Sequence, residues 1–141
     1  MPELPVTSDM VQFAVNVAKL TSADKLEWET TADADMLLAP LGGAYTARLE
    51  QVRFTDDQER DIQFVALSLL KSRQELFRLF PGNFYNTSFT RLLGVPTKDV
   101  SEVLEEMWDR AVVKAKKVAD ELNAVNRLLA EKLREDEEIP F

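Results

Sequence analysis

Residues 98–134 read KDVSEVLEEMWDRAVVKAKKVADELNAVNRLLAEKLR and contain neither proline nor glycine. Apolar residues recur within them at intervals of three and four, which is the period of an amphipathic helix. They are Val100, Val103, Leu104, Met107, Trp108, Ala111, Val112, Ala115, Val118, Ala119, Leu122, Val125, Leu129 and Leu133. Thr97 follows Pro96 and can cap the helix start. The pattern predicts one long C-terminal helix of roughly 55 Å, at about 1.5 Å per residue.

A small sheet cannot cover the second half of this predicted helix, because a strand of six or seven residues spans only roughly 20 Å. The apolar stripe nevertheless continues at the alternating spacings of a coiled-coil seam, with Val118, Leu122, Val125 and Leu129. We expect these four residues to pack against another helix. The helix could belong to the same chain or to a second copy, and we favour a homodimer. The alternative is a break near Asn123 or Asn126 that folds the end back.

The first part of the chain predicts a helix and then strands. An apolar stripe up to about residue 20 predicts a helix of about four turns, with an N-cap among residues 7–9 and Gln12 as a capping-box partner of Asp9. Alternation predicts strands at 26–30, 36–41 and 44–52. The last two are joined at Gly42-Gly43, which is a hairpin signal, and Pro40 indicates an edge or a bulge.

Residues 55–80 fit two structures. Their apolar residues lie on one face of a helix, for which Thr55 and Gln58 would form a capping box. The same residues also fit strands at 62–70 and 74–80, joined by a turn that is poor in turn-forming residues. We favour the hairpin, because a sheet of three short strands would leave both long helices with little to cover.

Pro81-Gly82 and Gly94 delimit a short predicted helix at 88–93. The expected fold is therefore α+β: an N-terminal helix, an antiparallel β-meander of about five strands, a short helix, a long C-terminal helix and an acidic tail. We expect a single domain over residues 1–134, followed by a tail over residues 135–141.

The composition argues against an enzyme. The chain has 141 residues and contains no cysteine and no histidine. A thiolate nucleophile, a Ser-His-Asp triad and the commonest metal ligand are therefore lacking. Carboxylates gather at Glu102, Glu105, Glu106 and Asp109, and at Asp33 and Asp35, but without a histidine partner. We expect no catalytic residues, no metal site and no cofactor.

The net charge is −8, which argues against binding to nucleic acid phosphates. Four of the 25 acidic residues lie at 135–138, however, so the rest of the chain has 17 basic and 21 acidic residues and is closer to neutral. Aromatic residues with flanking arginines on a sheet can stack single-stranded bases. Candidate contacts to single-stranded DNA are Arg48, Arg53, Arg78 and Tyr85. The alternative is that the aromatic residues form core and the arginines cover it.

The last residues are Asp136, Glu137, Glu138, Ile139, Pro140 and Phe141. This segment resembles the C-terminal tip of bacterial single-stranded DNA-binding proteins, an acidic run closed by Ile-Pro-Phe or Leu-Pro-Phe. The resemblance implies a docking peptide for genome-maintenance proteins such as nucleases, the primosomal helicase and recombination mediators. It assigns a ring and the terminal carboxylate to Phe141, a second apolar contact to Ile139 and Pro140, and long-range attraction to the three acids.

The body departs from that family, whose barrel is all β and is followed by a glycine- and glutamine-rich linker. We expect a non-enzymatic protein of DNA replication, recombination or repair, of bacterial or phage type, that presents the tip and binds single-stranded DNA or acts as an accessory. The alternative is a dimeric protein-interaction module without a nucleic-acid role. No apolar run approaches the roughly 20 residues of a membrane helix, and residues 1–5 lack the features of a secretory signal, so we expect a cytoplasmic protein.

Overall fold

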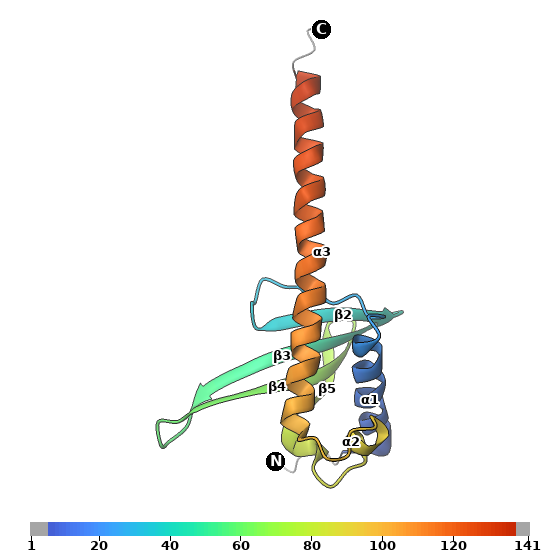
Figure 1. Cartoon of the computed structure of the whole chain (residues 1–141), viewed down its shortest axis with the longest axis vertical. Helices are drawn as coiled ribbons and strands as arrows, with labels where there is room; N and C mark the ends of the chain where they lie inside the picture. Colours follow the sequence, from blue (N-terminus) through green and yellow to red (C-terminus); the bar gives the residue numbers. More distant parts are fainter. Residues whose placement is uncertain (1–5, 138–141) are drawn as a thin grey trace.

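The computed structural model of the protein describes the backbone of residues 6–137 and the side chains of residues 6–135. Its elements follow the chain in a simple order (Figure 1). They are α1 (Ser8–Ser22), β1 (Glu29–Thr30), β2 (Met36–Gly42), β3 (Tyr45–Thr55), β4 (Asp61–Lys71), β5 (Gln74–Leu79), the 3-10 helix η1 (Pro81–Phe84), α2 (Phe89–Leu92) and α3 (Val100–Glu137). The predicted α+β class and its order of elements are confirmed.

The five strands form one antiparallel meander in the order β1-β2-β3-β4-β5. Leu49 of β3 lies opposite Leu37 of β2 and Leu67 of β4, and all three are buried. Side chains alternate across a strand, so the neighbouring Arg48 points to the other face, opposite Ser68. The sheet thus has one apolar face and one face that carries charged residues. We call the face that carries Arg48 and Ser68 the far face.

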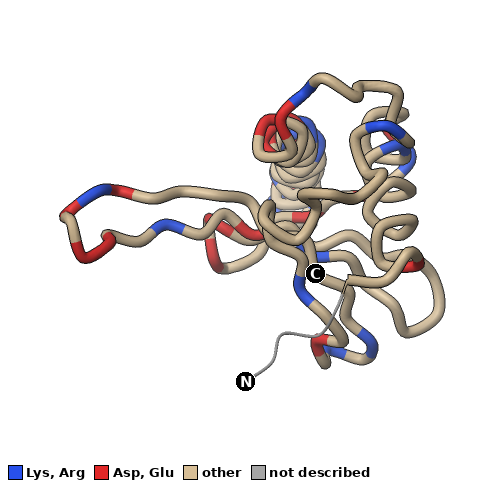
Figure 2. Tube along the Cα trace, turned by 90° about the horizontal axis from the view of Figure 1, so that it is seen from below, with Lys and Arg blue, Asp and Glu red and all other residues tan. Residues whose placement is uncertain are grey.

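Both long helices pack on the apolar face of the sheet, side by side (Figures 1 and 2). From α1, Phe13 meets Phe77 of β5 edge to face at 5.4 Å. From α3, Leu104 and Ala111 are fully buried in the same core. The core is closed beside β1 by Trp28, whose indole Nε1 donates a hydrogen bond to Thr21 Oγ1 of α1 at 3.1 Å.

The favoured hairpin over residues 62–80 is confirmed as β4 and β5. Its turn residues Ser72 and Arg73 have φ of 50° and 73°, as a type I′ hairpin turn requires, although neither is glycine. The predicted hairpin at Gly42-Gly43 and the bulge at Pro40 are also present, since the pairing of β2 with β3 shifts between Pro40 and Gly42.

Two details at the helix starts differ from the sequence prediction. Thr7 is the N-cap of α1 and accepts from the Met10 N–H at 3.2 Å, whereas the Gln12 amide donates to Asn16 rather than closing a capping box with Asp9. The longer helix, α3, begins at Val100 instead of Lys98. Helix ends are set by local hydrogen bonds that a periodic pattern does not resolve.

The distal half of α3 projects from the body as a single rod (Figure 1). The helix is continuous over 38 residues, so the predicted long helix is confirmed and the alternative, a break near Asn123 or Asn126, is wrong. Its residues from about 120 onward are exposed along nearly the whole length that the structure describes. Within the described part of the chain, none of the helices combines the length and the apolarity needed to cross a membrane.

Candidate interaction surfaces

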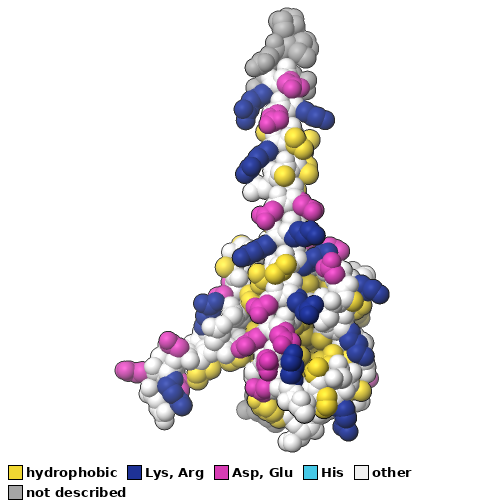
Figure 3. All heavy atoms as spheres, in the orientation of Figure 1, with side chains coloured by type: hydrophobic (Ala, Val, Ile, Leu, Met, Phe, Trp, Pro, Cys, Tyr) yellow, Lys and Arg dark blue, Asp and Glu magenta, His cyan; other side chains and the backbone are white. Residues whose placement is uncertain are grey.

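The first candidate surface is the apolar stripe on the distal half of α3. The predicted seam residues are 39% exposed at Val118, 59% at Leu122, 48% at Val125 and 51% at Leu129. Leu128 and Leu133 beside them are also exposed, and apolar side chains are visible along the projecting helix in Figure 3. Helix α1 packs against the base of α3 and leaves the stripe uncovered, so the option that α1 is its partner is wrong.

The stripe continues, along α3, the row of apolar residues that is buried in the core of the body. On the same helix, Leu104, Met107, Ala111 and Ala115 are buried against the sheet, and the next residues at the same spacing form the stripe. The helix therefore keeps one apolar face for its full length while the sheet covers only its first half. An exposed apolar row of this kind marks an interaction site in soluble proteins.

Two of the predicted DNA contacts, Arg48 and Arg78, do lie together on the far face of the sheet. Both lie opposite Ser68 of β4. Each is ion-paired: Arg48 with Glu75, and Arg78 with Glu50 at 2.9 Å and with Glu75 at 3.1 Å. Two arginines and two carboxylates leave this cluster without net charge, which removes the electrostatic attraction that phosphate binding needs.

The other two predicted contacts lie elsewhere. Arg53 is on the helix-covered side of the sheet, in the part of β3 that extends beyond the helices, and pairs with Asp35 at 3.5 Å. Tyr85 follows η1 and is exposed. The structure brings Arg48 and Arg78 together but does not join them with Arg53 and Tyr85 in one surface.

A row of aromatic residues on the far face was not predicted as a unit. Phe64 meets Phe54 at 6.1 Å and Phe80 at 5.6 Å between ring centroids, in both cases edge to face. The row crosses from Phe54 of β3 through Phe64 of β4 to Phe80, which follows β5. The outer ends of β3 and β4 with their turn at 56–60, which we call the β3–β4 arm, extend to the left in Figure 1. The alternation of Phe54 and Phe64 in their strands was visible in the sequence, but their register across β3 and β4 was not.

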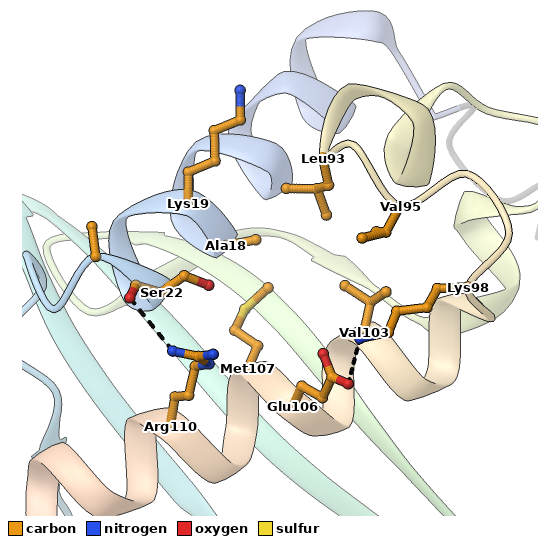
Figure 4. Close-up of a pocket in the computed structure, with 11 residues that line it drawn as sticks. Ala18, Lys19, Ser22, Leu93, Val95, Lys98, Val103, Glu106, Met107 and Arg110 are labelled. Atoms are coloured by element: carbon orange, nitrogen blue, oxygen red, sulfur yellow. Dashed lines mark hydrogen bonds and ion pairs between the residues drawn. The ribbon is translucent and has the colours of Figure 1, made fainter.

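A groove lies between α1, the loop after α2 and the first turns of α3 (Figure 4). Its volume is about 430 Å³. Six apolar residues line it: Ala18, Ala23, Leu93, Val95, Val103 and Met107. Charged residues stand around them: Lys19, Lys98, Glu106 and Arg110. The groove joins residues from both halves of the chain, and sequence patterns carried no signal for it.

Ion pairing affects one lysine beside this groove. The Lys114 ammonium lies 3.2 Å from Asp24 and 3.7 Å from Glu27, and its hydrogen bond to Asp24 raises its pKa above the ordinary value of 10.5. Lys114 therefore ties α3 to the segment after α1.

At the tip of the β3–β4 arm, backbone N–H groups of Arg60 and Gln58 donate to Asp56, which lowers its pKa below 3.8.

The predicted docking tip lies almost wholly outside the described residues. Helix α3 includes the backbone of Asp136 and Glu137, and the side chains of residues 136–141 lie outside the described part. Among the described residues, no three histidine, cysteine, aspartate or glutamate side chains are grouped to hold a metal ion. The carboxylates Glu102, Glu105, Glu106 and Asp109 lie on the exposed face of the first turns of α3, and Glu106 forms an ion pair with Lys98 at 2.6 Å.

Comparisons with known proteins found no match from which a function could be transferred to this chain. No protein-family model, no curated protein and no solved structure matches the chain.

Proposed function

We propose that this chain is a non-enzymatic, cytoplasmic interaction protein that forms a homodimer through the distal half of α3. The apolar stripe of Val118, Leu122, Val125 and Leu129 is the observation that carries the proposal. These side chains lie on a rigid helix at coiled-coil spacing, and they cannot reach the core of their own body. A second copy offers the same stripe and therefore a self-complementary surface.

The test is the oligomeric state measured by sedimentation velocity over a range of concentrations. Replacing Leu122 with Glu places a charge in the seam and should yield a monomer. The matched control is Leu92→Glu, which adds the same charge at an exposed leucine on α2, away from the stripe. It should stay dimeric. A wild-type protein that remains monomeric at high concentration would contradict the proposal.

A second proposed function builds on the tip at residues 136–141: recruitment of genome-maintenance proteins in DNA replication, recombination or repair. The observation that favours it is the projection of α3. From Arg110 to Glu137 the helix rises about 40 Å, which sets the start of the tip far from the sheet. A docking peptide benefits from this distance because its partner does not collide with the body.

The recruitment proposal is tested by binding to a protein that recognises such tips, for example the primosomal helicase. Phe141→Ala removes the aromatic anchor and should cost at least about 2 kcal/mol of binding free energy. Asp136→Asn removes one charge and should mainly reduce the association rate. Equal affinities for Phe141→Ala and the wild type would exclude anchoring by this residue.

Binding to single-stranded DNA is the weaker form of this proposal, because Arg48 and Arg78 are already paired. Titration of a fluorescent oligonucleotide at rising salt measures it directly. Affinity that falls steeply with salt would support DNA binding by the body. No binding at low salt would leave the tip-presenting accessory or the dimeric module.

A further inference from the structure

The apolar stripe and the sheet occupy the same face of α3. Ala111 and Ala115 are buried under the sheet, and Val118, Leu122 and Val125 continue the same row at intervals of three and four residues. In the described part of the chain, Ala115 is the last residue of α3 that is buried. The body of each chain therefore limits how far a second helix can run along the stripe.

A parallel pair of stripes does not fit. In such a pair the two bodies lie at the same end, and each sheet covers the face of α3 that is turned toward the second copy. Packed helices lie about 8–10 Å apart. Because α3 is one continuous helix, two helices that pack along the whole stripe keep that distance beside the sheet, which leaves no room for two sheets between them.

An antiparallel pair fits in one register. Two-fold symmetry places Val125 of each copy opposite Leu129 of the other, so that apolar residues meet at the centre of the pair. In this register Glu137 of the second copy comes level with Lys117. The second helix, whose described part ends at Glu137, thus stops two residues short of Ala115 and clears the sheet.

Moving the second helix by seven residues, the coiled-coil repeat, fails in either direction. Toward the body, Val118 comes opposite Leu129, and residues 132–137 of the second copy come level with the part of α3 that the sheet covers. Away from the body, Leu129 comes opposite Lys132, and the two stripes no longer face each other.

Charges beside the stripe match in the register that clears the sheet. One flank of the stripe carries exposed charged residues of both signs: Lys117, Glu121, Lys132 and Glu135. Antiparallel pairing places Glu121 beside Lys132 of the second copy, and Lys117 beside Glu135 of that copy. The two-fold symmetry repeats both pairs. The aliphatic part of Lys132 packs on Leu122 of the second copy while its ammonium reaches Glu121.

Leu128, which is 59% exposed, lies on the same flank between these charges. In the antiparallel pair it meets Leu128 of the second copy beside the two-fold axis. A parallel pair turns this flank toward Asn126 and Ala130 instead, which carry no charge. Charged residues on the flanks of a coiled coil set the orientation of its helices, so this flank selects the antiparallel pair.

We propose that the homodimer is antiparallel, with Val125 of each copy opposite Leu129 of the other and with the charges on the flank paired between the copies. This inference rests on the proposed homodimer and adds its orientation and register. The two bodies then lie at opposite ends of the dimer. Glu137 of each copy lies beside the body of the other, so recruitment through residues 136–141 is favoured in the monomer.

Disulfide crosslinking tests the orientation, because the chain has no cysteine of its own. Single-cysteine variants are purified, mixed in pairs, allowed to exchange subunits and oxidised, and the products are identified by intact mass. Val125→Cys with Leu129→Cys should give mainly the crosslinked heterodimer. Two outcomes overturn the proposal while the dimer stands: Val125→Cys that crosslinks mainly with itself, as in a parallel pair, and Val118→Cys that replaces Val125→Cys as the partner of Leu129→Cys.

Charge reversal tests the register by sedimentation equilibrium. Lys132→Glu should raise the dimer dissociation constant about tenfold, because the new carboxylate meets Glu121 of the second copy at two symmetric positions. Adding Glu121→Lys should lower the constant again by at least about threefold. The matched control is Asp120→Lys, which makes the same charge change on the side of α3 opposite the stripe and should not restore binding.

Equal effects of Glu121→Lys and Asp120→Lys in the Lys132→Glu background overturn the register and leave the dimer intact. A monomeric wild type overturns the dimer and this inference together.

Discussion

The guanidinium Nη2 atom of Arg78 lies 2.9 Å from Oε1 of Glu50, so that an ion pair joins β5 to β3 across the intervening β4. Glu75 completes the cluster by binding both Arg78 and Arg48 above the buried Ser68. The far face of the sheet is therefore held by paired charges, and its arginines are structural in the free protein.

Removing one carboxylate from this cluster should destabilise the fold. In Glu75→Gln, the side chain of Arg48, which is only 13% exposed, loses its charged partner. The expected loss is about 1–3 kcal/mol of unfolding free energy, measured by urea denaturation. Asp35→Asn is the control, because it breaks the exposed pair with Arg53 and should change stability by less than about 1 kcal/mol. Equal effects of both changes would contradict a structural role of the cluster.

Two leucines on α3 should respond differently to truncation. Leu104 is fully buried under the sheet, so Leu104→Ala should cost about 2–5 kcal/mol at any protein concentration. Leu122 is mostly exposed in the single chain, so Leu122→Ala should be nearly neutral in dilute solution. At concentrations where the wild type is dimeric, its cost should appear as a lowered thermal midpoint. A Leu122→Ala midpoint that tracks the wild type at all concentrations would argue against the seam.

The hydrogen bond from Trp28 to Thr21 should contribute about 1 kcal/mol, because both groups are buried. Thr21→Val removes the acceptor and keeps the shape of the side chain, but it leaves the indole N–H without a partner. Trp28→Phe removes the donor. A double-mutant cycle by urea denaturation should show that the two losses are not additive, whereas strictly additive losses would mean that the bond is not formed.

The lowered pKa of Asp56, at the β3–β4 arm, predicts that the stability of the fold depends on pH. Its pKa is lowered in the folded state by the N–H groups of Arg60 and Gln58, so its contribution to stability is present above the unfolded pKa of about 3.8. That contribution is lost as the pH falls through the lower, folded pKa. The stability difference between wild type and Asp56→Asn should therefore be larger at pH 6 than near pH 3. Urea midpoints at both pH values measure it, and a difference that grows on acidification would have the wrong sign.

Local pattern was sufficient for much of the fold. The helical period across residues 98–134, the alternation in β2 and β3 and the glycines at 42 and 43 act between near neighbours in the chain, so the sequence displays them directly. The stripe of α3 was predicted for the same reason, residue by residue. The β4–β5 hairpin was harder, because its turn uses Ser72 and Arg73 in a conformation that neither residue favours.

Contacts between distant residues were decided only by the tertiary structure. Arg48 meets Glu75 because the registers of β3, β4 and β5 bring them to one face, and Arg110 meets Ser22 because α1 and α3 cover the same sheet. Contacts of this kind depend on how segments that are distant in sequence pack together. A local pattern in the sequence does not encode that packing. The sequence by itself determined which residues of α3 are apolar. Only the packed body decided where the sheet ends, and with it which of those residues are buried and which remain free to bind.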